Sequence, residues 1–110
     1  MKGTYLGEFE ELILLTVAAN EQDAYAVIVK KEAEAIAQRK INISAVHSSL
    51  YRLERKGFLS STLGGSTPKR GGKQKRIFTV TNAGFEALKA SKAIKERLWK
   101  KIPRLSIVDV

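Results

Sequence analysis

Apolar residues recur at helical spacing along most of the chain, and this pattern predicts four helices. The expected helices span residues 4–20, 24–38, 45–56 and 82–101. Two shorter segments, residues 58–63 and 77–81, contain the β-branched and aromatic residues that are typical of strands. A run rich in glycine and lysine separates these two segments, so we expect them to pair as a β-hairpin with a long tip. The order of elements predicts a mainly α fold with a small β-hairpin wing.

The third expected helix has the clearest division between an apolar and a polar face. Val46, Leu50 and Leu53 follow one another at i, i+4 and i+7, which places them on one apolar stripe. Ser44 is a suitable N-cap, and Gly57 can close the helix because glycine tolerates the left-handed conformation after the last turn. Together with the preceding helix, which we expect Asp23 to cap, this element predicts a helix-turn-helix.

The face opposite this stripe is short, polar and positively charged, and it carries no acidic residue. Such a face can enter the major groove of DNA, where polar side chains meet base edges and arginines meet phosphates. Arg55 shares this side, but the residues that we predict to contact DNA are Ser44, His47, Ser48, Tyr51 and Arg52. The alternative is an ordinary amphipathic surface helix.

The distribution of charge favours a polyanionic partner. The net charge is +9, yet residues 1–23 contain five acids against Lys2, whereas residues 61–81 contain five basic residues and no acid. Clustered positive charge indicates a defined contact surface for a polyanion, although a basic surface can also serve solubility alone. Around the hairpin tip, we predict contacts with the phosphate backbone for Lys69, Arg70, Lys73, Lys75 and Arg76. The alternative is a flexible, solvated loop.

The first and last helices are apolar on two sides, and each therefore needs cover on two sides. In the first helix, one side carries Phe9 and Ile13 and the other carries Leu12 and Leu15, so it is either a central helix of the monomer or part of a dimer interface. In the last helix, which Thr81 can cap, we expect Phe85 and Leu88 to dock on the domain. The opposite side predicts dimerisation through Ala87, Ala90, Ile94, Leu98 and Trp99; a solvated tail helix is the alternative.

Several classes of protein are disfavoured by the composition. The chain has no cysteine and one histidine, so we expect no metal and no cofactor. It lacks the residue patterns of a nucleophilic triad and of a phosphate-binding loop, so we do not expect an enzyme. No apolar stretch approaches the length of a membrane span and no leader sequence is evident, so we expect no membrane association and a cytoplasmic location.

The joint order of several fragments resembles the PadR-like family of bacterial transcriptional regulators. The resemblance rests on five segments of this sequence, namely residues 6–10, 24–27, 44–57, 70–73 and 78–84. It departs from the family at Ala26, where members often have glycine. The resemblance implies a winged helix-turn-helix over residues 1–81, followed by a C-terminal dimerisation helix and tail over residues 82–110.

The same resemblance implies a function. It implies a homodimer, joined by the last helix with help from the first, that represses transcription from an operator on double-stranded DNA. A two-fold dimer is expected to prefer a pseudo-palindromic operator. Family members often respond to a small aromatic effector, and Trp99 could bind such a ligand or could belong to the dimer core. The alternative function is a winged-helix interaction module that binds RNA or an acidic protein partner.

Overall fold

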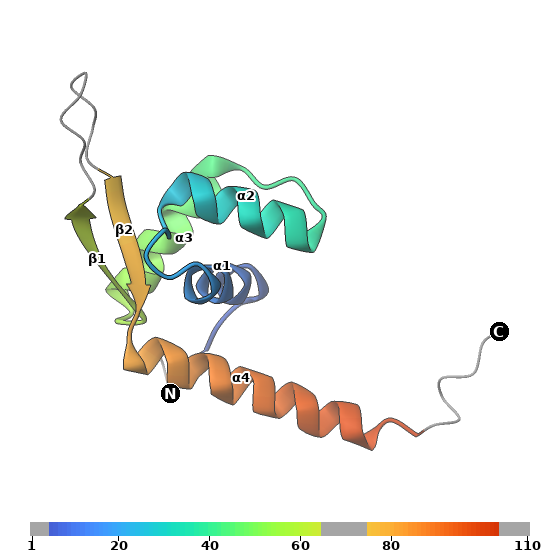
Figure 1. Cartoon of the computed structure of the whole chain (residues 1–110). Helices are drawn as coiled ribbons and strands as arrows, with labels where there is room; N and C mark the ends of the chain where they lie inside the picture. The colour runs from blue at the N-terminus through green and yellow to red at the C-terminus, as the bar shows by residue number, and fades with distance from the viewer. Residues whose placement is uncertain (1–4, 65–74, 104–110) are drawn as a thin grey trace.

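The computed structural model describes residues 5–64 and 75–103. Within these ranges the helices are α1 (Glu8–Ala19), α2 (Ala26–Ala37), α3 (Ile43–Arg55) and α4 (Asn82–Lys101). The strands β1 (Leu59–Gly64) and β2 (Lys75–Val80) form an antiparallel hairpin between α3 and α4 (Figure 1). This arrangement confirms the predicted mainly α fold with a β-hairpin wing. The predicted domain boundary between residues 81 and 82 stays a prediction.

The core lies where α1, α2, α3 and the hairpin meet. In Figure 1, α1 lies between α4 on one side and the α2–α3 pair on the other. Its buried apolar residues are Ile13, Leu14 and Val17. The predicted stripe of α3 packs against them, because Val46, Leu50 and Leu53 are all fully buried. Leu15, on another side of α1, stays exposed, so α1 is covered by its own chain only in part.

Two of the predicted helix caps are wrong and two are confirmed. Helix α3 begins one residue before Ser44, because the Asn42 side chain accepts a hydrogen bond of 2.6 Å from the Ser44 amide. Helix α2 begins after Tyr25 rather than after Asp23, with no hydrogen bond from a capping side chain. Thr81 caps α4 by accepting a bond from the Gly84 amide, and Gly57 adopts a φ of +85° after α3.

The wing is tied to the helical part of the chain through β2. The register pairs Leu59 with Val80 at one end and Gly64 with Lys75 at the other, so β2 begins two residues earlier than predicted. The Phe78 amide donates a 2.9 Å hydrogen bond to the carbonyl oxygen of Ala24. The segment that leads into α2 is thereby attached to β2, and this fixes the base of the wing beside the helix-turn-helix.

Only the first half of α4 packs on the domain. The buried residues of α4 are Gly84, Ala87 and Leu88, whereas Phe85 is 53% exposed. The predicted docking of Phe85 is therefore wrong, and Ala87, expected on the opposite side, faces the core. The reason is a close approach at Gly84, which lies against the Phe58 carbonyl and turns the face with Ala87 and Leu88 inward.

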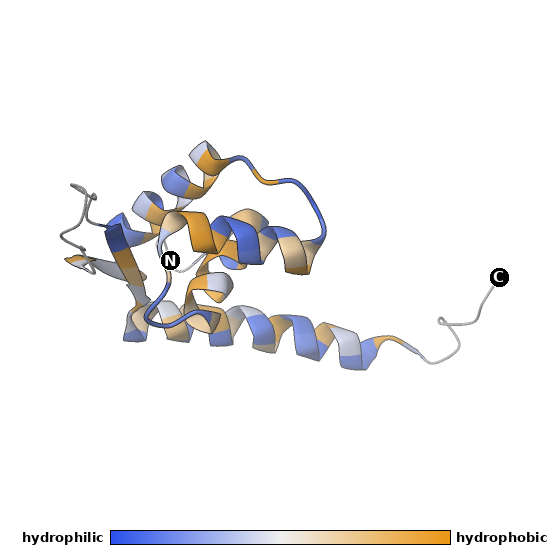
Figure 2. Ribbon diagram, turned by 45° about the horizontal axis from the view of Figure 1, so that its top comes forward, coloured by the Kyte–Doolittle hydropathy of each residue, from blue (hydrophilic) through white to orange (hydrophobic). Residues whose placement is uncertain are grey.

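The second half of α4 projects beyond the rest of the chain. Every residue from 92 to 101 is exposed, and Figure 1 shows this part of α4 extending past α1. Figure 2 shows hydrophobic positions among hydrophilic ones along α4 as far as this projecting part. Of the helices in the described ranges, none combines the length and apolar character needed to span a membrane.

Candidate nucleic-acid interface

The polar face of α3 is exposed as predicted. Tyr51 is 42% exposed, and the predicted contacts Ser44, His47, Ser48 and Arg52 are exposed as well. These residues share one side of the helix because the opposite stripe is anchored in the core. Arg55 is also exposed, and it forms no ion pair within residues 5–64 and 75–103. The structure thus leaves this polar, basic face of α3 open to a partner.

An aromatic hollow joins this face to the base of the wing. It has a volume of about 330 Å³ and is lined by Tyr25, Ala26, Val27, His47, Tyr51, Lys75, Arg76 and Phe78. The Tyr51 ring meets the Phe78 ring edge-on at 6.0 Å between centroids, and His47 stacks on Tyr51 at 6.4 Å. The Lys75 ammonium lies 4.5 Å from the centroid of the Tyr25 ring. Helix α3 and β2 therefore present one continuous surface.

The two basic residues of β2 that the structure describes differ in their surroundings. Lys75 is exposed at the start of β2. Arg76 is half-buried and donates a 2.9 Å hydrogen bond to the Ser61 hydroxyl, which donates in turn to Glu54 of α3 at 2.7 Å. Lys75 thus keeps its ammonium at the surface beside the Tyr25 ring, while Arg76 joins the wing to α3 through Ser61. Lys69, Arg70 and Lys73 lie outside the described residues.

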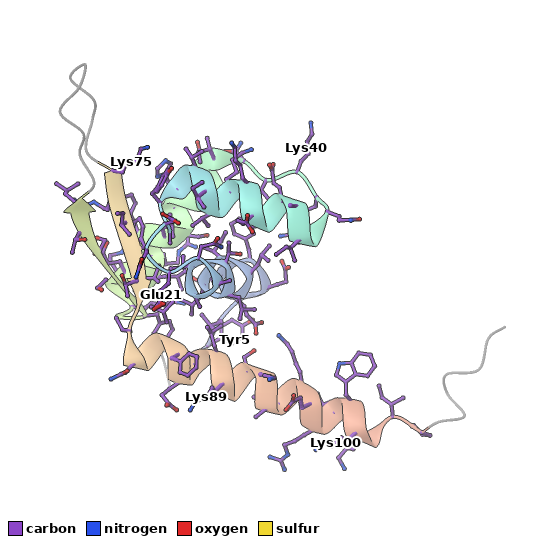
Figure 3. The ribbon with its side chains drawn as sticks, viewed as in Figure 1. Tyr5, Glu21, Lys40, Lys75, Lys89 and Lys100 are labelled. Atoms are coloured by element: carbon purple, nitrogen blue, oxygen red, sulfur yellow. The ribbon has the colours of Figure 1, made fainter. Side chains whose placement is uncertain are left out.

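Basic side chains project from two separate sides of the molecule. In Figure 3, Lys40 and Lys75 project from the side formed by α2, α3 and the wing, whereas Lys89 and Lys100 project from α4. The α2–α3 side is the one that carries the polar face of α3. Basic residues on α4 therefore provide controls of equal charge for any experiment on the α3 surface.

A buried carboxylate of α1 lies beneath the α3 face. Glu10 Oε1 accepts a 2.9 Å hydrogen bond from Lys56 Nζ and a 3.3 Å bond from the Gly7 amide. Its Oε2 lies 3.7 Å from Arg52 Nη1. Burial acts to raise the pKa of the Glu10 carboxyl, but the bonds from Lys56 and Gly7 and the nearby charges of Lys56 and Arg52 outweigh it. The net pKa lies below the ordinary value, and the carboxylate is charged at neutral pH.

Sequence reasoning missed three residues of this surface. Tyr25 belongs to a fragment used for the family resemblance, but nothing in its local pattern shows that it faces β2. Asn42 could have been found, because asparagine is as good an N-cap as serine. Glu10 carries no local signal, since its partners Arg52 and Lys56 follow more than 40 residues later in the chain.

A second surface is formed by α1 and the projecting half of α4. A hollow of about 790 Å³ lies between them, and its apolar lining is Leu12, Leu15, Ala18, Phe85, Leu88 and Trp99. Trp99 is 69% exposed, and Ile94 and Leu98 are exposed to a similar degree. The Ser91 hydroxyl donates to Glu11 of α1 at 2.8 Å, and Lys95 forms an ion pair with the same carboxylate. These bonds join α4 to α1 beyond the buried first half of α4.

Comparison with known proteins shows which solved structures share this fold. No protein-family model matches the chain, and no curated protein matches it. Among solved structures, the PadR-like transcription factor from Bacteroides fragilis matches with a TM-score of 0.70 at 22% identity, over 84% of each chain. The PadR-like transcriptional regulator from Bacillus cereus strain ATCC 14579 matches with a TM-score of 0.71 at 16% identity, over 92% of this chain and 93% of that one.

A third match comes from another bacterium. A PadR family transcription regulator from Clostridium difficile R20291 has a TM-score of 0.65 at 22% identity, over 86% of this chain and 93% of its own. The chain therefore has the winged-helix fold of several PadR-like regulators across most of its length. This confirms the fold that the fragments of sequence implied.

Proposed function

We propose that the chain is a sequence-specific, DNA-binding transcriptional regulator that acts as a homodimeric repressor on a pseudo-palindromic operator. The observation that carries this proposal is the continuous surface made by the polar face of α3 and the base of the wing. An exposed helix with polar and basic side chains fits a major groove, and a cationic strand beside it fits the adjacent backbone.

The two parts of this surface have different tasks in the proposal. Ser44, His47, Ser48, Tyr51 and Arg52 of α3 contact base edges or nearby phosphates, and they supply sequence selectivity. Lys75, with Lys69, Arg70 and Lys73, holds the phosphate backbone from the wing. Phosphate contacts add affinity for any sequence, whereas contacts with base edges distinguish one sequence from another.

Two substitutions test this division of tasks. We expect Arg52→Ala to weaken binding to the operator by about 1–3 kcal/mol and to relax sequence selectivity. We expect Lys75→Ala to weaken binding to all duplexes alike and to lower the salt dependence by about one unit. Fluorescence anisotropy with a duplex from the chain's own upstream region, and with a random duplex, measures both effects.

The control for charge is Lys100→Ala on α4, far from the α3 surface (Figure 3). This variant should bind both duplexes as the parent does. An Arg52→Ala variant that loses as much affinity for the random duplex as for the operator, as Lys75→Ala is expected to do, would contradict the assigned tasks. RNA of the same sequence, added as competitor, separates this proposal from an RNA-binding module: RNA that competes as well as DNA counts against the proposal.

The proposed dimer is supported by the projecting half of α4. Its ten residues from Lys92 to Lys101 extend about 15 Å at 1.5 Å per residue, and they carry Ile94, Leu98 and Trp99 exposed to solvent. Leu12 and Leu15 of α1 lie in the neighbouring hollow and can complete such an interface. A second copy would cover apolar surface that the monomer leaves in water.

A small aromatic effector is the last part of the proposal. Trp99 lines the 790 Å³ hollow, and a planar ligand could stack on its ring where two copies meet. Trp99 is the sole tryptophan of the chain, so its fluorescence reports on this place alone. A ligand that quenches Trp99 and also releases the DNA supports this part of the proposal; quenching with no change in DNA affinity contradicts it.

A further inference from the structure

One buried carboxylate of α1 faces two cations at the C-terminal end of α3. Glu10 is 8% exposed and lies on α1, while Arg52 lies in the last turn of α3 and Lys56 directly follows the end of that helix. Each oxygen of the carboxylate faces a different cation, Oε1 toward Lys56 and Oε2 toward Arg52. The Gly7 amide also donates to Oε1, which helps to fix the orientation of the side chain.

The two cations are held to different degrees. The Lys56 side chain is 26% exposed, lies 2.9 Å from Glu10 and donates a second bond of 3.3 Å to the Tyr5 carbonyl. The Arg52 side chain is 48% exposed, and its 3.7 Å separation from Glu10 exceeds the range of a hydrogen bond. Lys56 is thus a fixed partner of Glu10, whereas Arg52 is drawn toward the carboxylate without being bonded to it.

We propose that Glu10 is a positioning residue that restrains Arg52 on non-specific DNA and so increases the sequence selectivity of the α3 surface. This inference rests on the proposed function. Non-specific affinity depends on the number of phosphates that the protein neutralises. An arginine attracted to an internal carboxylate contributes little to that number. On the operator, a base edge or phosphate is placed to accept a hydrogen bond from the guanidinium of Arg52. Such a bond is stronger than the 3.7 Å contact with Glu10, so Arg52 then turns to the DNA.

The test is the substitution Glu10→Gln, which keeps the shape of the side chain and removes its charge. On a random-sequence duplex, the slope of log affinity against log salt should steepen by about 0.9, the value for one additional phosphate contact. For a variant and a parent of equal affinity at 1 M salt, this slope makes Glu10→Gln bind random DNA roughly eightfold more tightly than the parent at 0.1 M salt. Glu11→Gln is the matched control, because Glu11 pairs with Lys95 on α4 and its loss removes the same charge from the same helix.

A double variant identifies the cation responsible. In an Arg52→Ala background, Glu10→Gln should leave the slope unchanged, because the restrained charge is absent. A slope that still steepens in that background, or that steepens equally with Glu11→Gln, overturns the inference. So does a Glu10→Gln variant that folds and binds random DNA with the parent's slope.

A further measurement does not depend on the folding of Glu10→Gln. If Arg52 is held back on random DNA, then Arg52→Ala alone should change the random-DNA slope by less than about 0.3, whereas Lys75→Ala lowers it by about one. A loss of about one for Arg52→Ala also overturns the inference. A parent protein that binds no DNA at any salt concentration refutes the proposed function itself, and this result is distinct from all the others.

Discussion

The substitution Gly84→Ala tests the joint from which α4 leaves the domain. A Cβ atom at residue 84 would lie 2.3 Å from the Phe58 carbonyl oxygen and 3.0 Å from Val80 Cγ1. The Phe58 carbonyl cannot withdraw freely, because it accepts a 3.0 Å hydrogen bond from the Thr81 amide. The clash is therefore with fixed backbone rather than with the end of a flexible side chain, and α4 itself has to shift.

The expected cost follows from two opposing terms. Overpacking costs about 1–3 kcal/mol, and a contact with backbone belongs at the upper end of this range. Alanine has a higher helix propensity than glycine, and this offsets the overpacking cost by at most about 1 kcal/mol, and by less in the first turn of a helix. The net loss of unfolding free energy is about 2 kcal/mol. With an unfolding entropy of about 2.1 cal/mol/K per residue, a chain of 110 residues should lose roughly 9 °C in Tm.

Circular dichroism at increasing temperature, together with urea denaturation, measures this loss. The matched control is Gly7→Ala, because a Cβ there has nothing within 4 Å and the φ of residue 7 is −72°. We expect that control to lower Tm by no more than about 4 °C, because residue 7 is the N-cap of α1, where alanine costs up to about 1 kcal/mol relative to glycine. If Gly84→Ala melts within 2 °C of the parent or of the control, the close approach of α4 to Phe58 does not hold the joint as argued.

Three further predictions concern the caps, the assembly and acid stability. Asn42→Ala should lower the unfolding free energy by about 1 kcal/mol in urea denaturation, whereas Ser44→Ala should change it by less than half as much; the reverse order would restore Ser44 as the cap. In sedimentation velocity, Leu98→Asp should shift the proposed dimer to monomer while Lys100→Asp leaves it intact, and a parent that sediments as a monomer contradicts the dimer. Since the pKa of Glu10 is lowered on folding from its usual 4.5, this carboxylate stabilises the fold above about pH 4.5, and the stabilisation is lost as the pH falls through the lower, folded value. Tm measured from pH 7 to pH 2 should therefore fall less for Glu10→Gln than for the parent, and parallel curves would contradict this.

Local interactions made much of the fold predictable from the sequence. The stripe of Val46, Leu50 and Leu53 identifies the buried side of α3, because a helical period relates residues within two turns. Gly57 and Thr81 mark helix ends for the same reason, since a cap acts within three residues of its own position. The exposed, basic side of α3 follows from the buried stripe without knowledge of any other element.

The sequence left open which of two apolar helix faces is buried and which distant side chains pair, and only the tertiary structure decided these points. Helix α4 has two apolar sides, and the close approach of Gly84 to a carbonyl determined that Ala87, not Phe85, faces the core. The pairing of Glu10 with α3 joins segments whose separation along the chain leaves no periodic signal. Arg76 and Lys75 are neighbours of the same charge, yet Arg76 bonds Ser61 while Lys75 lies over the Tyr25 ring. Contacts between elements depend on how their faces meet in space, and a one-dimensional pattern does not contain that information.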